Sequence, residues 1–139
     1  MLDRAKTSPP ESLIQTHERL RLLHAAFLQF DAPVTFERCR ISALTWQSCH
    51  FRAAASFIEC TFTGPVIFDC CDFEAALLLH GNQFNGFVNV YDGQFRAAVR
   101  ISKNDFQAGS SLLGNQGQPF RNTFATPPIL TDNLGNLAL

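Results

Sequence analysis

Residues 51–116 read FRAAASFIECT (51–61), FTGPVIFDCCD (62–72), FEAALLLHGNQ (73–83), FNGFVNVYDGQ (84–94), FRAAVRISKND (95–105) and FQAGSSLLGNQ (106–116) when the chain is written in rows of eleven. Every row begins with Phe, and its seventh position is again large and apolar. Upstream, the row FDAPVTFERCR begins at Phe30, and the ten-residue row ISALTWQSCH begins at Ile41. The repeat therefore runs from Phe30 to about Gln116, and it decides the architecture.

The first and seventh positions of the rows are the predicted interior positions. We predict that they form the structural core: Phe30, Phe36, Ile41, Trp46, Phe51, Phe57, Phe62, Phe68, Phe73, Leu79, Phe84, Val90, Phe95, Ile101, Phe106 and Leu112. The third position is Ala or Gly in every row. The tenth position is small or an amide: Cys39, Cys49, Cys60, Cys71, Asn82, Gly93, Asn104 and Asn115.

Neither a helix nor a flat strand accounts for this pattern. Gly and Asn recur inside the rows, and Pro33 and Pro65 fall within them, which disfavours a helix. The large residues are alternately six and five positions apart, whereas a flat strand needs an even spacing to keep them on one face. The chain must therefore wind as a coil, whose backbone groups bond to the coils above and below.

Single five-residue units carry a resemblance to a known family. Cys49–Ala53, Cys71–Ala75, Asn82–Gly86 and Asn104–Ala108 each have a small or amide residue, a polar residue, Phe, a polar residue and then Ala or Gly. This pattern resembles the pentapeptide-repeat family, with one extra residue in alternate units. The resemblance implies an all-β solenoid, a right-handed quadrilateral parallel β-helix with four units, or 22 residues, in each of about four coils.

Two further expectations follow from a 22-residue coil. Phe51, Phe73 and Phe95 should stack in one column, and Phe62, Phe84 and Phe106 in the opposite one. Asn82 and Asn104 should lie one coil apart and bond to each other or to turn backbone. The alternative is a flat, two-sided coil of eleven residues per turn.

The ends predict a three-part organisation: a tail with a capping helix over 1–29, the β-helix over 30–116, and an irregular cap or partner-binding tail over 117–139. Ser8 to Glu11 form a capping box, which predicts a helix over 9–28. Its apolar face would comprise Leu13, Ile14, His17, Leu20, Leu23, His24 and Phe27. The resemblance implies a homodimer through the C-terminal end.

Composition narrows the function classes. The chain has 139 residues, a net charge of −1, and 14 Phe against one Tyr and one Trp. It has no basic field for nucleic acid and no apolar run long enough to span a membrane, so we expect neither a nucleic acid nor a membrane as partner. It also has no apolar core of a signal peptide. An odd number of cysteines without a signal peptide predicts the cytoplasm.

No catalytic, cofactor-binding or metal-binding residue is predicted, and no cofactor is expected. Four cysteines occupy the inward tenth position, and Cys70 is the outward thiol that should react with reagents. His17 and His24 are predicted to pack on the helix, and His50 and His80 to face solvent.

The sequence thus predicts a non-enzymatic scaffold that binds an unknown protein partner. One alternative, which the family resemblance implies, is a DNA mimic that binds gyrase. It would have eight acidic against six basic residues over 30–115. The other is a carbohydrate-active β-helix that uses Asp72 and Glu74.

Overall fold

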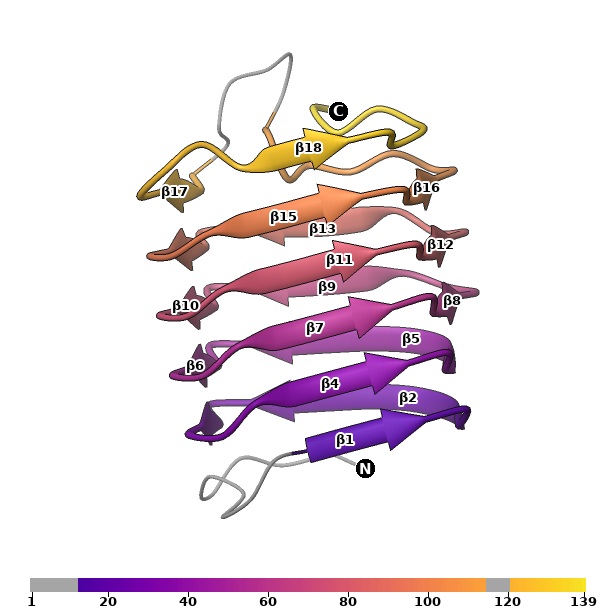
Figure 1. Ribbon diagram of the computed structural model, residues 1–139, viewed down its shortest axis with the longest axis horizontal. Helices are drawn as coiled ribbons and strands as arrows, with labels where there is room; N and C mark the ends of the chain where they lie inside the picture. The colour runs from indigo at the N-terminus through magenta and orange to yellow at the C-terminus, as the bar shows by residue number, and fades with distance from the viewer. Residues whose placement is uncertain (1–12, 115–120) are drawn as a thin grey trace.

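The computed structural model of the protein describes residues 13–114 and 121–139. These residues form an all-β solenoid, in which parallel strands stack through about four regular coils, with a further partial coil at each end (Figure 1). The described residues contain no helix. The predicted all-β solenoid is therefore confirmed, while the predicted N-terminal helix is wrong.

One sheet runs the length of the solenoid. Its six parallel strands are β1 (Leu13–Thr16), β4 (Val34–Glu37), β7 (Ala55–Ile58), β11 (Leu77–His80), β15 (Val99–Ser102) and β18 (Ile129–Thr131). The pairing is in register, so that Phe36, Phe57, Leu79, Ile101 and Leu130 follow one another along the axis. We call this the first sheet.

Two more sheets complete each coil. The second sheet contains the short strands β3 (Gln29–Phe30), β6 (His50–Phe51), β10 (Asp72–Phe73), β14 (Gln94–Phe95) and β17 (Thr123–Phe124). The third sheet contains β2 (Arg19–Ala26), β5 (Arg40–Gln47), β8 (Thr61–Phe62), β9 (Val66–Asp69), β12 (Gln83–Phe84), β13 (Val88–Tyr91) and β16 (Asp105–Phe106). A regular coil thus has two four-residue strands and two two-residue strands.

The ten-residue rows change the shape of the first coils. In the third coil a corner at about residue 64 separates β8 from β9. In the first two coils this corner is absent, and β2 and β5 are each continuous over eight residues. The row from Ile41 lacks one residue, and the row from Leu20, in register with it, lacks the same one. Without the extra corner residue, the short strand and the long strand merge into one.

Strands β1 and β2 occupy the segment for which a helix was predicted. Strand β2 places Leu20, Leu23 and Ala25 directly below Ile41, Leu44 and Trp46 of the next coil. Leu28 follows β2 at the position that corresponds to the tenth-position cysteines. Leu23, Ala25 and Leu28 are buried. Ile14 and Phe27, which were expected on the helix face, are exposed. The physical reason is that neighbouring strands offer this segment a full ladder of hydrogen bonds. The capping box at 8–11 lies outside the described residues.

The C-terminal segment, expected to be irregular, contains β17 and β18. Asn122 and Phe124 take up the positions above Gly93 and Phe95, seven residues later than the period predicts. Residues 115–120, which include the tenth-position Asn115, lie outside the described residues. After β18, residues 132–139 cross above β16 without forming a strand, and Leu134 makes a single bridge to Asp105.

The interior is a set of stacked aromatic columns. All sixteen residues predicted for the core are buried. The longest column has ring centroids 4.8, 4.6, 5.1 and 4.8 Å apart and consists of Phe30, Phe51, Phe73, Phe95 and Phe124. A second column has spacings of 4.8 Å and consists of Phe62, Phe84 and Phe106. Both predicted stacks are therefore confirmed.

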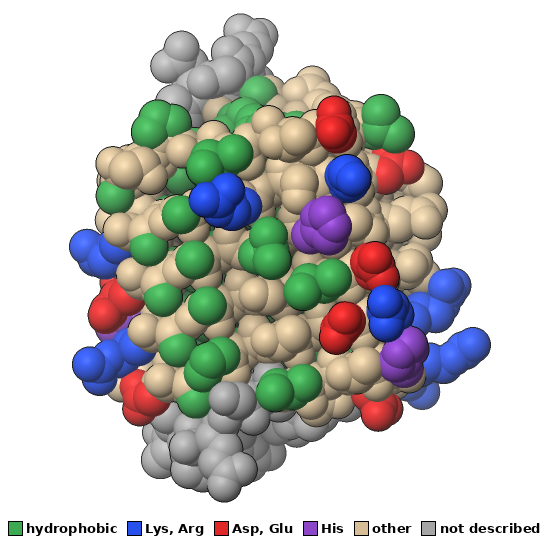
Figure 2. Space-filling view, viewed as in Figure 1, with side chains coloured by type: hydrophobic (Ala, Val, Ile, Leu, Met, Phe, Trp, Pro, Cys, Tyr) green, Lys and Arg blue, Asp and Glu red, His purple; other side chains and the backbone are tan. Residues whose placement is uncertain are grey.

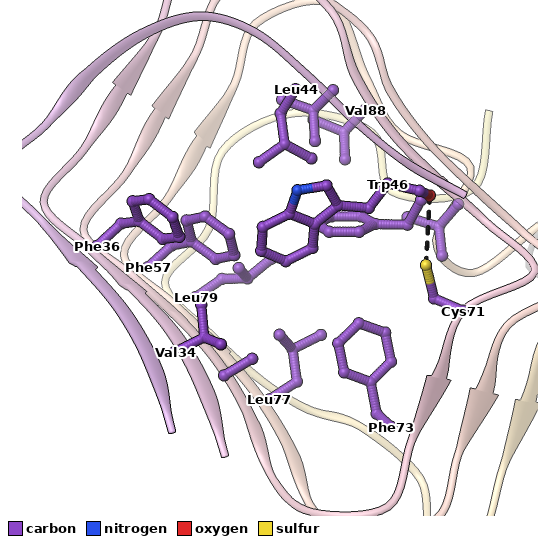
Figure 3. Close-up of a cluster of buried hydrophobic side chains, with 14 of the residues drawn as sticks. Val34, Phe36, Leu44, Trp46, Phe57, Cys71, Phe73, Leu77, Leu79 and Val88 are labelled. Carbon is purple, nitrogen blue, oxygen red and sulfur yellow. Dashed lines mark hydrogen bonds between the residues drawn. The ribbon is translucent and has the colours of Figure 1, made fainter. Parts of the chain in front are cut away.

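Trp46 fills the seventh position of its row and lies in the middle of the core (Figure 3). Its ring contacts Phe51 and Phe57, with centroids 5.1 and 5.6 Å away. Ala25, in register directly below, leaves room for the larger ring. The indole Nε1 is buried without a hydrogen-bond partner among the described residues, so packing alone holds the ring.

Candidate interaction surfaces

Two inward columns of polar side chains lie beside the aromatic stacks and are structural. Each buried cysteine donates its thiol hydrogen to a backbone carbonyl of the coil below. The acceptors of Cys39, Cys49, Cys60 and Cys71 are the carbonyls of Gln15, Ala25, Phe36 and Trp46, at 3.4, 3.6, 3.3 and 3.3 Å (Figure 3). Burial raises the pKa of Cys60 to about 11, which keeps it a protonated donor. These thiols act as small, satisfied core residues.

Asparagines take over the same role in the upper coils. The Oδ1 of Asn104 accepts from the backbone N–H and the Nδ2 of Asn82 at 2.8 and 3.0 Å. Its Nδ2 donates to the Leu79 carbonyl at 2.8 Å. Asn133 repeats the arrangement one coil higher. The predicted bonding between Asn82 and Asn104 is confirmed.

Because the interior is filled, the positions open to a partner are those that point outward. Parallel, in-register strands turn each outward position into a ladder with one side chain per coil. The three sheets therefore present three kinds of surface, which differ in charge.

On the surface of the second sheet, the charged side chains pair with one another. Arg96 holds Asp72 of the coil below with two hydrogen bonds, at 2.8 and 3.1 Å, and the same contact raises the pKa of Arg96. Arg52 reaches Asp31 at 3.8 Å. His50, which is half-buried, pairs with Glu74 of the coil above. Each of these side chains is matched by a partner one coil away.

This neutralisation bears on both alternative functions. Four of the eight acidic residues over 30–115 are in ion pairs with arginines, namely Asp31, Glu59, Asp72 and Asp92, and Glu74 contacts His50. A DNA mimic needs a continuous row of unpaired negative charges. A glycosidase needs two carboxylates that share one substrate, whereas Asp72 and Glu74 are held apart, Asp72 by Arg96 and Glu74 by its contact with His50.

The first sheet has a largely uncharged surface. Figure 2 faces this sheet and shows hydrophobic and uncharged polar side chains over most of it. On it, the Nδ1 of His80 lies 2.8 Å from the Oγ of Ser102, one coil above. The described residues provide no carboxylate bonded to His80, so this pair lacks the third group that orients a catalytic base.

Cys70 is the exposed thiol among the five free cysteines. It lies at a corner with a left-handed φ of 56°, and its Sγ is 3.8 Å from Asp92. A side-chain hydrogen bond to Asp69, partial burial and the two negative charges raise its pKa to about 11. Cys70, Asp69 and Asp92 could present ligand atoms within 4.8 Å of one another, but a protonated thiol is a poor metal ligand, so we assign no metal centre there.

We expect Cys70 to react with a disulfide reagent about tenfold more slowly at pH 8 than an unperturbed thiol. The raised pKa lowers the thiolate fraction about a hundredfold, and the greater nucleophilicity of the remaining thiolate recovers roughly tenfold of this loss. The rate should rise with pH up to about 11. Asp69→Asn should accelerate the reaction and Asp105→Asn should not, as measured by release of the coloured thiol. Equal rates in both variants would contradict this account.

The histidines lie apart from one another. His17 is exposed at a left-handed corner with φ 58°, and His24 points outward from β2 and is half-buried. The prediction that they share a packed helix face is therefore wrong. His50 and His80 do occupy outward positions, but each is partly covered by its partner side chain.

Among the described residues, the C-terminal end of the solenoid is open over β17 and β18, whereas residues 134–139 bond to the coil below on the side of β16. Leu130 is 40% exposed, whereas Ile101, directly below it in the same column, is fully buried. Leu134 and Leu139 are also exposed. Strands β17 and β18 are the last in their sheets, so the described residues leave one edge of each without a neighbour. Uncovered apolar side chains and free strand edges together favour contact with another chain.

Among the described residues there is no helix with the length and apolar character needed to cross a bilayer. Two sequence signals mark the strands at the ends. The row from Leu20 repeats the ten-residue row from Ile41, and Asn122–Ala125 repeats the unit that begins at Asn104.

Comparison of the chain with protein-family models, with curated proteins and with solved structures finds no match.

Proposed function

We propose that the protein is a non-enzymatic interaction module, a rigid rod whose flat faces bind a protein partner. The observation that carries this proposal is the filled interior: the columns of buried aromatic rings leave the outward ladders as the positions available for recognition. Stacked coils hold these ladders at a fixed spacing of about 4.8 Å, so a partner meets a preorganised surface.

We also propose the finer description of the fold, a right-handed, four-sided coil of the pentapeptide-repeat type. The alternation of two four-residue and two two-residue strands in each 22-residue coil supports four sides. The five-residue units centred on Phe51, Phe73 and Phe106 support the family resemblance. A crystal structure would test both the handedness and the number of sides.

The interaction function is tested by capture and reconstitution. The purified full-length protein is used as bait in an extract of its host, and a captured protein is then produced separately and mixed with it. We expect a complex of defined stoichiometry in sedimentation velocity. Failure of every captured protein to bind in purified form would contradict the proposal. Unchanged gyrase supercoiling in the presence of excess protein would separate this function from DNA mimicry.

We propose a homodimer through the open C-terminal end. Leu130 and Leu134 would be covered by the same residues of the second copy. The edges of β17 and β18 that the described residues leave without a neighbour would face the same edges of that copy. The sedimentation mass should be twice the chain mass of 15.5 kDa. Leu130→Glu should give the monomer, whereas Leu22→Glu, at an exposed site near the other end, should remain dimeric. A monomer in the unaltered protein would refute the proposal.

The five free cysteines support a reducing compartment, and we therefore propose the cytoplasm. Fluorescence microscopy of the tagged full-length protein in its host would test this placement.

A further inference from the structure

Three arginines lie together where the third sheet begins. Arg19 of β2 is in register with Arg40 of β5, so their Cα atoms face each other on neighbouring strands about 4.8 Å apart. Arg21 lies two residues further along β2, at the point where the register with β5 skips one pair. All three side chains are exposed. We call Arg19, Arg21 and Arg40 the basic cluster.

The basic cluster carries a positive charge that the described residues do not neutralise. Their ion pairs engage the guanidinium groups of Arg38, Arg52, Arg96 and Arg121, but not those of the cluster. Like charges directly opposite each other on neighbouring strands are destabilising. A negatively charged group that binds across Arg19 and Arg40 would relieve this repulsion.

Along the third sheet the basic cluster borders apolar and hydroxyl side chains, and acidic residues lie at the corner before it. Arg21 is followed by Leu22, which pairs with Ala43 and is half exposed. The next coil presents the hydroxyl groups of Thr61 and Thr63. Figure 2 shows Lys and Arg side chains that project from the lower half of the right-hand edge, and β12 and β16 lie higher on the same edge in Figure 1.

We propose that the basic cluster is the docking site of an acidic protein segment, an inference that rests on the proposed interaction function. In an extended peptide, carboxylates at positions i and i+2 are about 7 Å apart, the same spacing as Arg19 and Arg21 on β2. Charge-assisted hydrogen bonds to guanidinium groups would hold both carboxylates. An apolar side chain next to the second carboxylate would rest on Leu22.

The extent of the cluster favours a peptide over a nucleic acid. The basic cluster covers two strands only, and Glu18, Glu37 and Glu59 lie at the corner beside it. Glu18 and Glu37 would repel a long polyphosphate but leave room for two negative groups, whereas Glu59 is already paired with Arg38. The net charge of −1 likewise provides no field to attract a polyanion.

The test uses the full-length protein and a fluorescein-labelled peptide with the sequence Gly-Ser-Glu-Ser-Glu-Leu-Ser-Gly, followed by anisotropy. We expect saturable binding that weakens with salt. The triple variant Arg19→Gln/Arg21→Gln/Arg40→Gln should lose at least tenfold in affinity. The matched control Arg52→Gln/Arg96→Gln, which removes two paired arginines from the second sheet, should bind as the unaltered protein does.

Several outcomes would overturn the inference. These are no saturable binding of the peptide, equal binding of the Gln-for-Glu peptide, equal loss in the control variant, or tighter binding of a single-stranded oligonucleotide or of phosphatidylserine vesicles. A triple variant with an unfolding midpoint below that of the unaltered protein would do the same, because it would mean that the arginines already have partners.

Failure of this inference differs from failure of the interaction function. If the triple variant still forms the reconstituted complex with the same affinity, the basic cluster is not the docking site and the interaction function stands. If no partner is reconstituted at all, the interaction function fails, while peptide binding at the cluster is still measured directly.

Discussion

Phe73→Ala is expected to lower the free energy of unfolding by about 3–5 kcal/mol. The ring is buried between Phe51 and Phe95, at centroid distances of 4.6 and 5.1 Å, and meets the edge of Phe68 at 6.2 Å. Its removal takes away two stacked contacts and leaves a cavity, because the rings above and below are fixed by their own coils and cannot close the gap.

Denaturant unfolding followed by Trp46 fluorescence measures this loss. Trp46 is the single tryptophan of the chain and is fully buried, so its emission shifts when the coils separate. Phe27→Ala is the control: Phe27 is 71% exposed, and its removal should change the free energy by less than about 0.5 kcal/mol. A loss below about 1 kcal/mol for Phe73→Ala would show that the stack collapses around the gap.

Asn104→Leu is expected to destabilise the protein by about 3 kcal/mol or more. The change removes the acceptor of two Asn82 donors and the donor to the Leu79 carbonyl, which leaves three buried polar groups without their present partner. Each such group costs about 1–3 kcal/mol, part of which the structure recovers by relaxation.

Asn104→Cys is the matched variant, since cysteine occupies this column in the lower coils. There the Sγ of Cys60 donates to the Phe36 carbonyl at 3.3 Å, as the Nδ2 of Asn104 donates to the Leu79 carbonyl. We therefore expect the cysteine variant to retain most of the stability that the leucine variant loses. The same unfolding measurement compares them, and equal losses would mean that volume, not hydrogen bonding, decides this position.

The stacked Phe columns and the inward Asn column could be read from the sequence because each of these residues faces one of its own kind, whereas the buried fifth position of the rows, as at Ala55, Val66 and Leu77, was not predicted. A Phe at one position predicts the Phe one coil away, as for Phe51 and Phe73, and Asn82 predicts Asn104 in the same way. These columns depend only on the repeat length of 22 residues. The repeat therefore contains the information needed for the interior.

The N-terminal coil was missed because eleven residues are close to three helical turns of 3.6 residues. A coil that places apolar residues at Leu13, Leu20 and Leu23 therefore imitates one face of a helix. The missing residue in the row from Leu20 further disguised the repeat. At the other end, seven additional residues before Asn122 shifted the period and hid β17.

The surface could not be predicted in the same way. The ion pairs Asp72–Arg96 and His50–Glu74 join residues 24 apart, not 22, because these side chains reach diagonally across the coil boundary. The choice between the two possible diagonal pairs depends on the length and direction of the side chains. The repeat pattern does not contain this information. The stacking of Arg19 on Arg40 likewise required the register of β2, which the helix prediction had removed.

Parallel stacking also determines how the molecule opens. Each coil bonds only to the coil above and the coil below, so its amide hydrogens are released when one neighbour departs. Unzipping from either rim exposes one layer at a time, whereas opening in the middle breaks two interfaces at once. Amide exchange should therefore be slowest near Phe73 and become faster toward both tips, a gradient set by connectivity rather than by composition.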